Sequence, residues 1–266
     1  MASPDRPTRM LVVVAHPDDE TFGCGSLLAH ATRTGMTTMV ACATRGEAGT
    51  PPEGFDLSGR SLAEVRVDEL HTAADLLGVD QVQVLDWGDS GMDGEPKPGT
   101  LCAAPLGDVT TAIAALLDEF EPDLVITLDA SDGHRDHAHI RDATIAACAA
   151  ASWRVGVCYL HCLPRVLMAK WVAELARRMP DSDHLALGEL GTPEEEITTR
   201  IDTSELLELR EQAIAVHASQ TSPYEVMPAD LRAEFLTTER LKRVLPKWAG
   251  GAVERALDDS RGAATQ

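Results

Sequence analysis

The chain alternates between short apolar runs and stretches whose apolar residues recur at helical spacing. Residues 124–128, LVITL, are apolar on both faces, as in a strand that helices cover on both sides. Residues 62–77 instead place apolar side chains three or four positions apart, and Gly78 follows where a helix C-cap is expected. The pattern predicts strands joined by helices.

The predicted elements follow one another in regular order. Strands are expected at residues 10–15, 37–43, 82–85, 124–128 and 155–159. Helices are expected at residues 22–34, 62–77, 109–120, 138–151 and 203–218, the last with Asp202 or Thr203 as N-cap. Such alternation predicts an α/β fold with a doubly wound, mostly parallel sheet and helices on both faces.

We expect one domain at residues 1–223 and a C-terminal helical appendage and tail of the same domain at residues 224–266. The tail is expected to fray from about Asp258. Residues 46–60 and 90–105 are rich in glycine and proline and lack periodicity, so we expect functional loops there.

Composition narrows the classes of partner. The 266 residues are enough for a sizeable core, and the net charge of −20 disfavours nucleic acid and anionic membrane surfaces. A small-molecule substrate fits better, although solubility alone also explains such a charge. Oligomeric state stays open, and a homo-oligomer is possible.

Cysteine usage and the N-terminus indicate a compartment. The six cysteines form no CxxC pair and are expected to be reduced thiols. Cys158 and Cys162 flank His161, which leaves a metal site there as a minor alternative. The start of the chain lacks a secretory pattern and no run is long enough to span a membrane, so a cytoplasmic location is expected.

Ionisable residues follow the first strand without a break. Residues 16–20 read His-Pro-Asp-Asp-Glu, and burying such groups is unfavourable unless they are paired or bind a metal. The carboxyl ends of strands are where α/β sheets bind ligands. Taken alone, the segment also fits a turn with helix-capping aspartates.

A second ionisable cluster follows the fourth strand. Residues 129–139 read DASDGHRDHAH, in which His134 and His137 are three positions apart; taken alone, a solvated helix start also fits. Hydrolytic zinc sites commonly use two nitrogens and one carboxylate, which His16, Asp19 and one histidine of this cluster would supply. Asp18 is then better placed as general base, and a second histidine could stay protonated beside the ion.

Six motifs in order resemble the LmbE/PIG-L family of zinc-dependent N-deacetylases. They are residues 15–20 (AHPDDE), 44–49 (TRGEAG), 66–70 (RVDEL), 89–92 (DSGM), 133–137 (GHRDH) and 217–220 (HASQ). The match extends over roughly residues 9–220. It implies a Rossmann-like fold and cleavage of an acetamide, often on an N-acetylglucosamine unit.

The resemblance also implies a role for each site residue. The metal ligands would be His16, Asp19 and His137, for Zn²⁺ or for Fe²⁺ or another divalent metal. The catalytic residues would be Asp18 as general base, His134 as electrophile or general acid, and Asp136 in support. Arg66 and Asp89 would contact sugar hydroxyls, and Glu20 would hold a ligand by a hydrogen bond.

Two positions depart from the family pattern. Arg135 stands where the family has proline, and either contacts an anionic substrate group or faces solvent. Asp132 stands where some thiol-sugar members have tyrosine, which weakens assignment to that branch.

The leading hypothesis is a zinc amidohydrolase acting on a small N-acyl amino sugar. An amidase of a mycothiol-like thiol-sugar conjugate, or a deacylase of a secondary-metabolite glycoside, is the alternative. A nucleotide-binding module would need a glycine-rich motif that residues 23–25 supply only in part. A metal-binding protein without catalysis is a third class, which a turnover measurement would distinguish.

Overall fold

The computed structural model describes residues 6–258, and the predicted tail beyond Asp258 lies outside them. Within that range one seven-stranded sheet has the order β3-β2-β1-β4-β5-β7-β6. The strands are β1 Arg9–Val14, β2 Thr37–Cys42, β3 Gln81–Val84, β4 Leu124–Leu128, β5 Val157–His161, β6 Thr199–Asp202 and β7 Thr238–Leu245. The first five are parallel, whereas β7 runs antiparallel to both β5 and β6.

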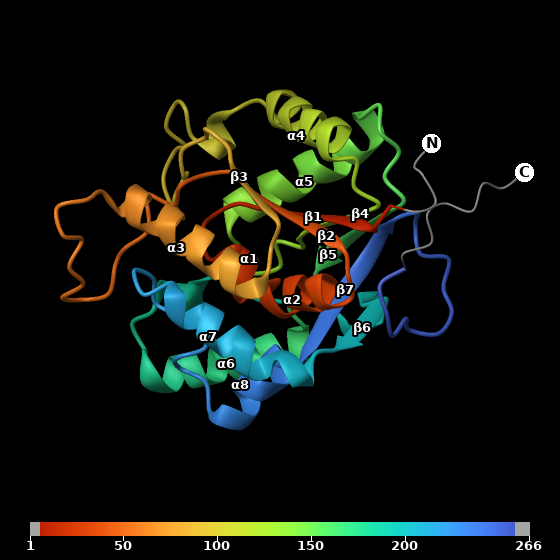
Figure 1. Cartoon of the computed structure of the whole chain (residues 1–266). Coiled ribbons are helices and arrows are strands. Elements are labelled where there is room, and N and C mark those ends of the chain that lie inside the picture. The colour runs from red at the N-terminus through yellow and green to blue at the C-terminus, as the bar shows by residue number, and fades with distance from the viewer. Residues whose placement is uncertain (1–5, 259–266) are drawn as a thin grey trace, which may run out of the picture.

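Helices cover both faces of the sheet (Figure 1). They are α1 Asp19–Phe22, α2 Gly25–Arg33, α3 Leu62–Leu77, α4 Leu106–Phe120, α5 Arg135–Ala150, α6 Arg165–Arg178, α7 Leu207–Val216 and α8 Ala229–Leu236. Short 3₁₀ turns lie at η1 Leu101–Ala103, η2 Asp183–Ala186, η3 Glu194–Glu196 and η4 Ser204–Leu206. The predicted doubly wound, mostly parallel α/β fold is confirmed.

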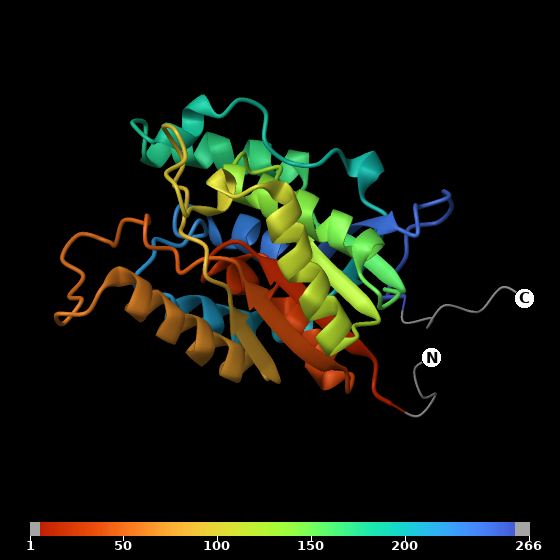
Figure 2. The ribbon, with the colours of Figure 1, turned by 90° about the horizontal axis from the view of Figure 1, so that it is seen from above.

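Three apolar clusters hold these layers together. Side chains of α2, α3 and α7 pack on one face of the sheet, and those of α4 and α5 pack on the other. Figure 2 shows α4 and α5 lying across the strands on their face. A third cluster joins α6 and α8 with the segment around Tyr224. Burial on this scale is the main stabilising contribution to such a fold.

The helix at residues 62–77 matches its prediction residue for residue, because local signals define both of its ends. Ser61 and Glu64 form a reciprocal capping box at the N-terminus. Gly78 ends the helix with φ 79°, a left-handed conformation that glycine adopts without strain.

Several predicted bounds need correction. The helix expected at residues 22–34 is two helices, α1 and α2, and begins at Asp19. The helix expected from residue 138 begins at Arg135, so the second ionisable cluster includes a helix N-terminus. In place of the helix expected at residues 203–218, a short η4 precedes α7.

The C-terminal part differs most from the prediction. The helix α6 was not predicted, although apolar residues recur along it at helical spacing. The segment expected to be a helical appendage contains α8 but also β7, which lies inside the sheet between β5 and β6. The last part of the chain is therefore integral to the sheet.

The remaining expectations concern cysteines and membranes. All six cysteines are unpaired. Cys158 and His161 point to opposite faces of β5, because side chains alternate along a strand, so they do not share a metal site. Among the described helices, none has the length and apolarity that a membrane span requires.

Candidate active site

The candidate site lies at the carboxyl edge of the sheet, between β1 and β4. These strands pair with each other, but the chain leaves β1 toward β2 and leaves β4 toward β5. Ligands bind at such a switch point in open α/β sheets. Residues 16–20 follow β1, and residues 129–137 follow β4. The structure therefore brings the two predicted clusters together.

The turn after β1 directs two successive aspartates to different neighbours. Asp18 has φ 124°, a conformation that is strained for a residue with a side chain. It occupies the N-cap position of α1 but makes no capping hydrogen bond through its side chain. Asp19 is the first residue of the helix, and its Oδ2 accepts the backbone N–H of His16 at 2.8 Å. Helix capping therefore does not account for Asp18.

Two histidines turn one nitrogen each toward the Asp19 carboxylate. His16 Nδ1 lies 3.5 Å from Asp19 Oδ2, and His137 Nε2 lies 3.2 Å from Asp19 Oδ1. Their other ring nitrogens contact carboxylates: His16 Nε2 lies 3.2 Å from Asp136 Oδ2, and His137 Nδ1 lies 2.5 Å from Asp132 Oδ2. Metal-binding histidines typically hold their second nitrogen in this way.

The donor set fits a divalent cation. His137 Nε2 is buried without a hydrogen-bond partner, although it faces Asp19. Burial alone would lower the pKa of His137, yet Asp19 and Asp132 raise it to about 10. Burial opposes ionisation of Asp19, yet His137 and His16 hold its pKa well below the usual range. A cluster this rich in carboxylates favours positive charge, which protons or a metal ion can supply.

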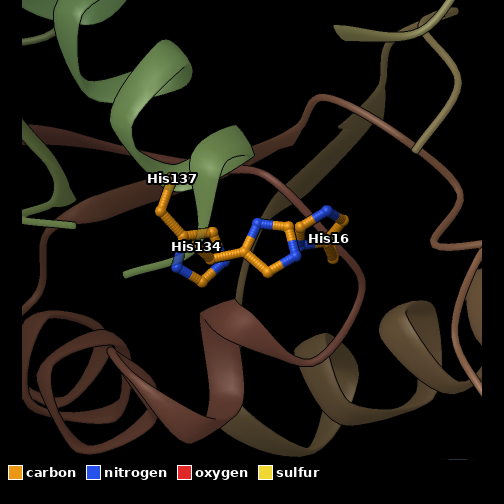
Figure 3. A group of neighbouring side chains, drawn as sticks. All are labelled: His16, His134 and His137. Carbon is orange, nitrogen blue, oxygen red and sulfur yellow. The ribbon is translucent and has the colours of Figure 1, made fainter. Parts of the chain in front are cut away.

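His134 completes the histidine cluster in a different way. His16, His134 and His137 each bring a nitrogen within 4.8 Å of the others, and Figure 3 shows the three rings together. His134 is the N-cap of α5, where its Nδ1 accepts the backbone N–H of Asp136 at 3.2 Å. Burial, with His16 and His137 nearby, lowers the pKa of His134 to about 4. Because Nδ1 accepts this hydrogen bond, a neutral His134 carries its proton on Nε2.

Asp18 faces the cavity beside a buried arginine. Its Oδ2 accepts a hydrogen bond from Arg66 at 2.9 Å. Burial raises the pKa of Asp18 to about 6, although the Arg66 guanidinium lowers it. Arg66 also donates to the carbonyls of Pro17 and Gly46 at 2.6 and 2.7 Å. Arg66 thus holds Asp18 and the turn, and these bonds occupy much of the guanidinium that was predicted to contact sugar hydroxyls.

Glu20 supports the turn rather than a metal ligand. Its Oε2 accepts the backbone N–H of Asp18, and its Oε1 lies 2.8 Å from His217 Nε2. Nearby, the Glu69 carboxylate accepts both the backbone N–H and the hydroxyl of Ser219. The late motif at residues 217–220 is therefore part of the support of the site.

Asp89 lies within the site, on a loop that the start of α5 holds. Its Oδ1 is 3.4 Å from His16 Nε2 and accepts the backbone N–H of Gly91 at 2.8 Å. The next residue, Ser90, donates its backbone N–H to Asp136 Oδ2 at 2.9 Å. His16, Asp89 and Asp136 form a second group of close ligand atoms, but they use the outer nitrogen of His16. We interpret them as the support of His16.

The Arg135 side chain is bound within the protein, in contrast to both expectations for it, a solvent-facing side chain or a contact with a substrate anion. Its guanidinium donates to four backbone carbonyls of one loop, those of Ser90, Gly91, Asp93 and Gly94. These bonds use most of the five N–H donors of an arginine side chain. Where the family pattern has proline, this chain thus fastens the Asp89 loop to α5.

A cavity of about 420 Å³ opens at these side chains, within the usual range for small-molecule sites. One half is polar and includes His16, Asp18, Asp19, Arg66, Asp89, Asp132, His134, His137, Gln220 and Thr221. The other half is mostly apolar and includes Phe22, Leu128, Leu163, Met168, Trp171, Leu190, Tyr224, Met227 and Phe235.

Sequence reasoning missed two parts of this site. Asp132 was noted only as a departure, yet it contacts His137; its position five residues before a candidate ligand histidine was the available signal. The apolar half comes from α6, α8 and the segment between α7 and α8, where no motif marks a site.

Fold and site thus describe an α/β protein with a candidate metal-binding cluster at its switch point. Residues 11–148 match the family model described as PIG-L, GlcNAc-PI de-N-acetylase. The chain is 35% identical over 240 residues to 1D-myo-inositol 2-acetamido-2-deoxy-alpha-D-glucopyranoside deacetylase of Thermobifida fusca, covering 80% of this chain and 84% of the relative. The chain belongs to the PIG-L family, which confirms the resemblance and the expectation of an amide-hydrolysing enzyme.

Solved structures support the fold alone. N,N'-diacetylchitobiose deacetylase from Pyrococcus horikoshii superposes with a TM-score of 0.57 at 22% identity, over 89% of this chain and 83% of that one. A 4-carboxy-2-hydroxymuconate hydratase from Pseudomonas putida gives 0.60 at 17% identity, over 92% and 99%. Because a hydratase shares the architecture, function has to be argued from the site.

Proposed function

We propose that this protein is a zinc-dependent N-deacetylase that removes the acetyl group from a small molecule containing N-acetylglucosamine. The observation that carries the proposal is the convergence of His16 Nδ1 and His137 Nε2 on the Asp19 carboxylate. Two nitrogens and one carboxylate are the ligand set of many hydrolytic zinc sites, although Fe²⁺ or another divalent ion suits the same donors. The substrate class rests on the relatives, whose name specifies an acetamido sugar.

His16, Asp19 and His137 would hold the ion. A bound zinc ion supplies Lewis acidity to amide hydrolysis. Asp136 and Asp132 keep the two imidazoles in the tautomers that leave Nδ1 of His16 and Nε2 of His137 as the inward nitrogens.

Asp18 acts as general base. Arg66 binds its Oδ2, so we assign Oδ1 to accept the proton from the water that attacks the amide carbonyl. The proton then passes to the leaving amine. His134 donates its Nε2–H to the oxygen that becomes negative during the attack, because its Nδ1 is already an acceptor at the helix N-terminus.

The test measures metal content and amine release together. Wild-type protein should contain close to one zinc ion per chain and release amine from N-acetylglucosaminyl-inositol. His137→Ala should lose bound zinc and activity, whereas the matched variant His139→Ala on the same helix should keep both. Full activity in chelator-treated, metal-free protein would overturn the proposal. Amine release from a thiol-sugar conjugate alone would favour the alternative amidase function.

The six unpaired cysteines support the predicted cytoplasmic location.

A further inference from the structure

The cavity extends well beyond what a deacetylation reaction needs. An acetyl group adds a single methyl to the carbonyl, yet about half of the cavity lining is apolar. This half is one side of a single cluster in which Phe22, Trp171, Tyr224 and Phe235 pack with leucine and methionine side chains. Phe22 and Leu128 join the two halves, since Phe22 ends α1 and Leu128 ends β4.

The polar atoms of the two aromatic side chains Trp171 and Tyr224, in the apolar half of the cavity, are hydrogen-bonded to backbone carbonyls. Trp171 Nε1 donates to the Pro223 carbonyl at 3.0 Å, and the Tyr224 hydroxyl donates to the Phe22 carbonyl. Both side chains are more than nine-tenths buried, with exposed fractions of 7% and 6%. Their ring carbons therefore form the surface that a ligand would meet.

Two ionisable side chains line the cavity near this apolar wall. Asp129 follows Leu128, and its carboxylate accepts the hydroxyls of Ser131 and Thr192. His161 lines the cavity, and its Nε2 lies 3.1 Å from Glu239 Oε2. Glu239 is paired with the buried Arg210 at 2.5 Å. This half thus offers an apolar surface with one imidazole and one hydrogen-bonded carboxylate at its edge, which suits a hydrocarbon group better than a sugar or an inositol.

Strand order determines which end of the substrate reaches the apolar wall. The metal cluster follows β1 and β4, which lie in the middle of the parallel strands. On the β2 and β3 side the lining comes from Gly49, Asp89 and Gly91. These residues belong to the loop between β2 and α3 and the loop between β3 and α4, which extend from the body of the molecule (Figure 1). On the β5 side the lining is the apolar wall. An amide held between them would place its hydroxylated amine part on the first side and its acyl part on the second, because apolar groups favour the apolar wall.

We propose that the apolar half of the cavity is an acyl-binding chamber, so that this enzyme also hydrolyses, beyond N-acetyl substrates, N-acyl amino sugars with longer aliphatic acyl groups. The inference rests on the proposed deacetylase function and extends its acyl specificity. The reaction itself is unchanged: water adds to the carbonyl, the C–N bond breaks, and a carboxylate and an amine leave.

The test uses the zinc-loaded enzyme and glucosamine carrying N-acetyl, N-butanoyl, N-hexanoyl or N-octanoyl groups. Each buried methylene should raise kcat/KM about fourfold while the chamber fills, so hexanoyl should exceed acetyl by at least tenfold. Octyl N-acetylglucosaminide, with the chain on the sugar, should gain little over N-acetylglucosamine.

Two variants narrow the chamber from different walls. Met168→Trp on α6 and Leu163→Phe after β5 should each lower the ratio of hexanoyl to acetyl kcat/KM about tenfold. Val166→Trp adds the same side chain to α6 at a position with 54% exposure, and should leave the ratio unchanged. Melting temperatures show whether each variant is folded. If one of the two chamber variants does not fold, the other is used for the test.

The outcomes separate this inference from the proposed function. Hydrolysis of N-acetylglucosamine with falling rates for longer chains would overturn the chamber and leave the deacetylase intact. A gain confined to the octyl glycoside would also overturn it, because the wall would then bind the other end of the substrate. No amine release from any N-acyl sugar would overturn the proposed function itself.

Discussion

The two halves of the cavity are fixed in different ways. In the polar half, His16, His137 and Asp18 each contact a further charged side chain, namely Asp136, Asp132 and Arg66. In the apolar half, the side chains meet through ring and aliphatic contacts, such as the edge-on pair of Phe22 and Tyr224. Paired charges require one geometry, whereas dispersion contacts tolerate changes of shape. Substitutions in the polar half should therefore affect metal and turnover, and those in the apolar half should affect substrate choice and stability.

The largest effect is expected for Asp18→Asn. An amide cannot accept the proton, so kcat should fall about 10²- to 10⁴-fold while bound zinc is retained. Single-turnover kinetics and metal analysis on the same sample check this. Asp56→Asn, in the loop after β2, is the control and should behave as wild type. An unchanged kcat for Asp18→Asn would remove this residue from catalysis.

Asp132→Ala comes next, because it leaves the ligand histidine in place and removes only its support. Without the carboxylate at its Nδ1, His137 is free to change tautomer and orientation, and zinc affinity should fall about 10- to 100-fold. Competition with a chelator measures the affinity. Asp142→Ala, an exposed aspartate on α5, the helix that carries His137, is the matched control. Equal affinities in both variants would contradict the role of Asp132.

A smaller effect is expected for Arg135→Met. Loss of four hydrogen bonds frees the loop that carries Asp89, so KM should rise roughly tenfold while zinc content and melting temperature change little. Arg135→Lys should give an intermediate KM, since lysine retains a cation but not the planar fork. Arg177→Met, which breaks an exposed ion pair, controls for loss of charge. A lower kcat at unchanged KM would indicate a role other than positioning the loop.

The smallest effect is expected in the apolar half. Trp171→Phe removes one hydrogen bond to Pro223 and part of a ring, which should lower the free energy of unfolding by about 1 to 2 kcal/mol. Zinc content, and kcat on an N-acetyl substrate, should remain those of wild type. Denaturant unfolding and metal analysis provide the readouts, and a loss of zinc would show that the two halves are coupled.

The polar half could be predicted from sequence because short motifs follow the strands directly. A strand followed by His-Pro-Asp-Asp-Glu predicts both where the residues lie and what they do, and the structure brings His16, Asp19 and His137 together as expected. Arg66 lines the cavity, but its partner Asp18 could not be inferred, because their contact spans 48 positions in the chain.

The C-terminal elements were predicted poorly for a related reason. β7 pairs with β5 across about eighty positions, and its residues alternate too little to distinguish a sheet strand from a surface segment. The apolar wall has the same origin, since its members come from α1, α6, α8 and the segment around Tyr224. Long-range pairing, and not local propensity, determines these regions.

The position of β7 has a consequence for the order in which the chain folds during synthesis. Until residues 238–245 emerge from the ribosome, β5 has no partner on that side and exposes a row of unpaired backbone groups. The parallel strands that carry the candidate site residues are already complete by then. A nascent chain therefore passes through a stage with its chemistry assembled and its sheet open, at which pausing or premature termination would favour aggregation over folding.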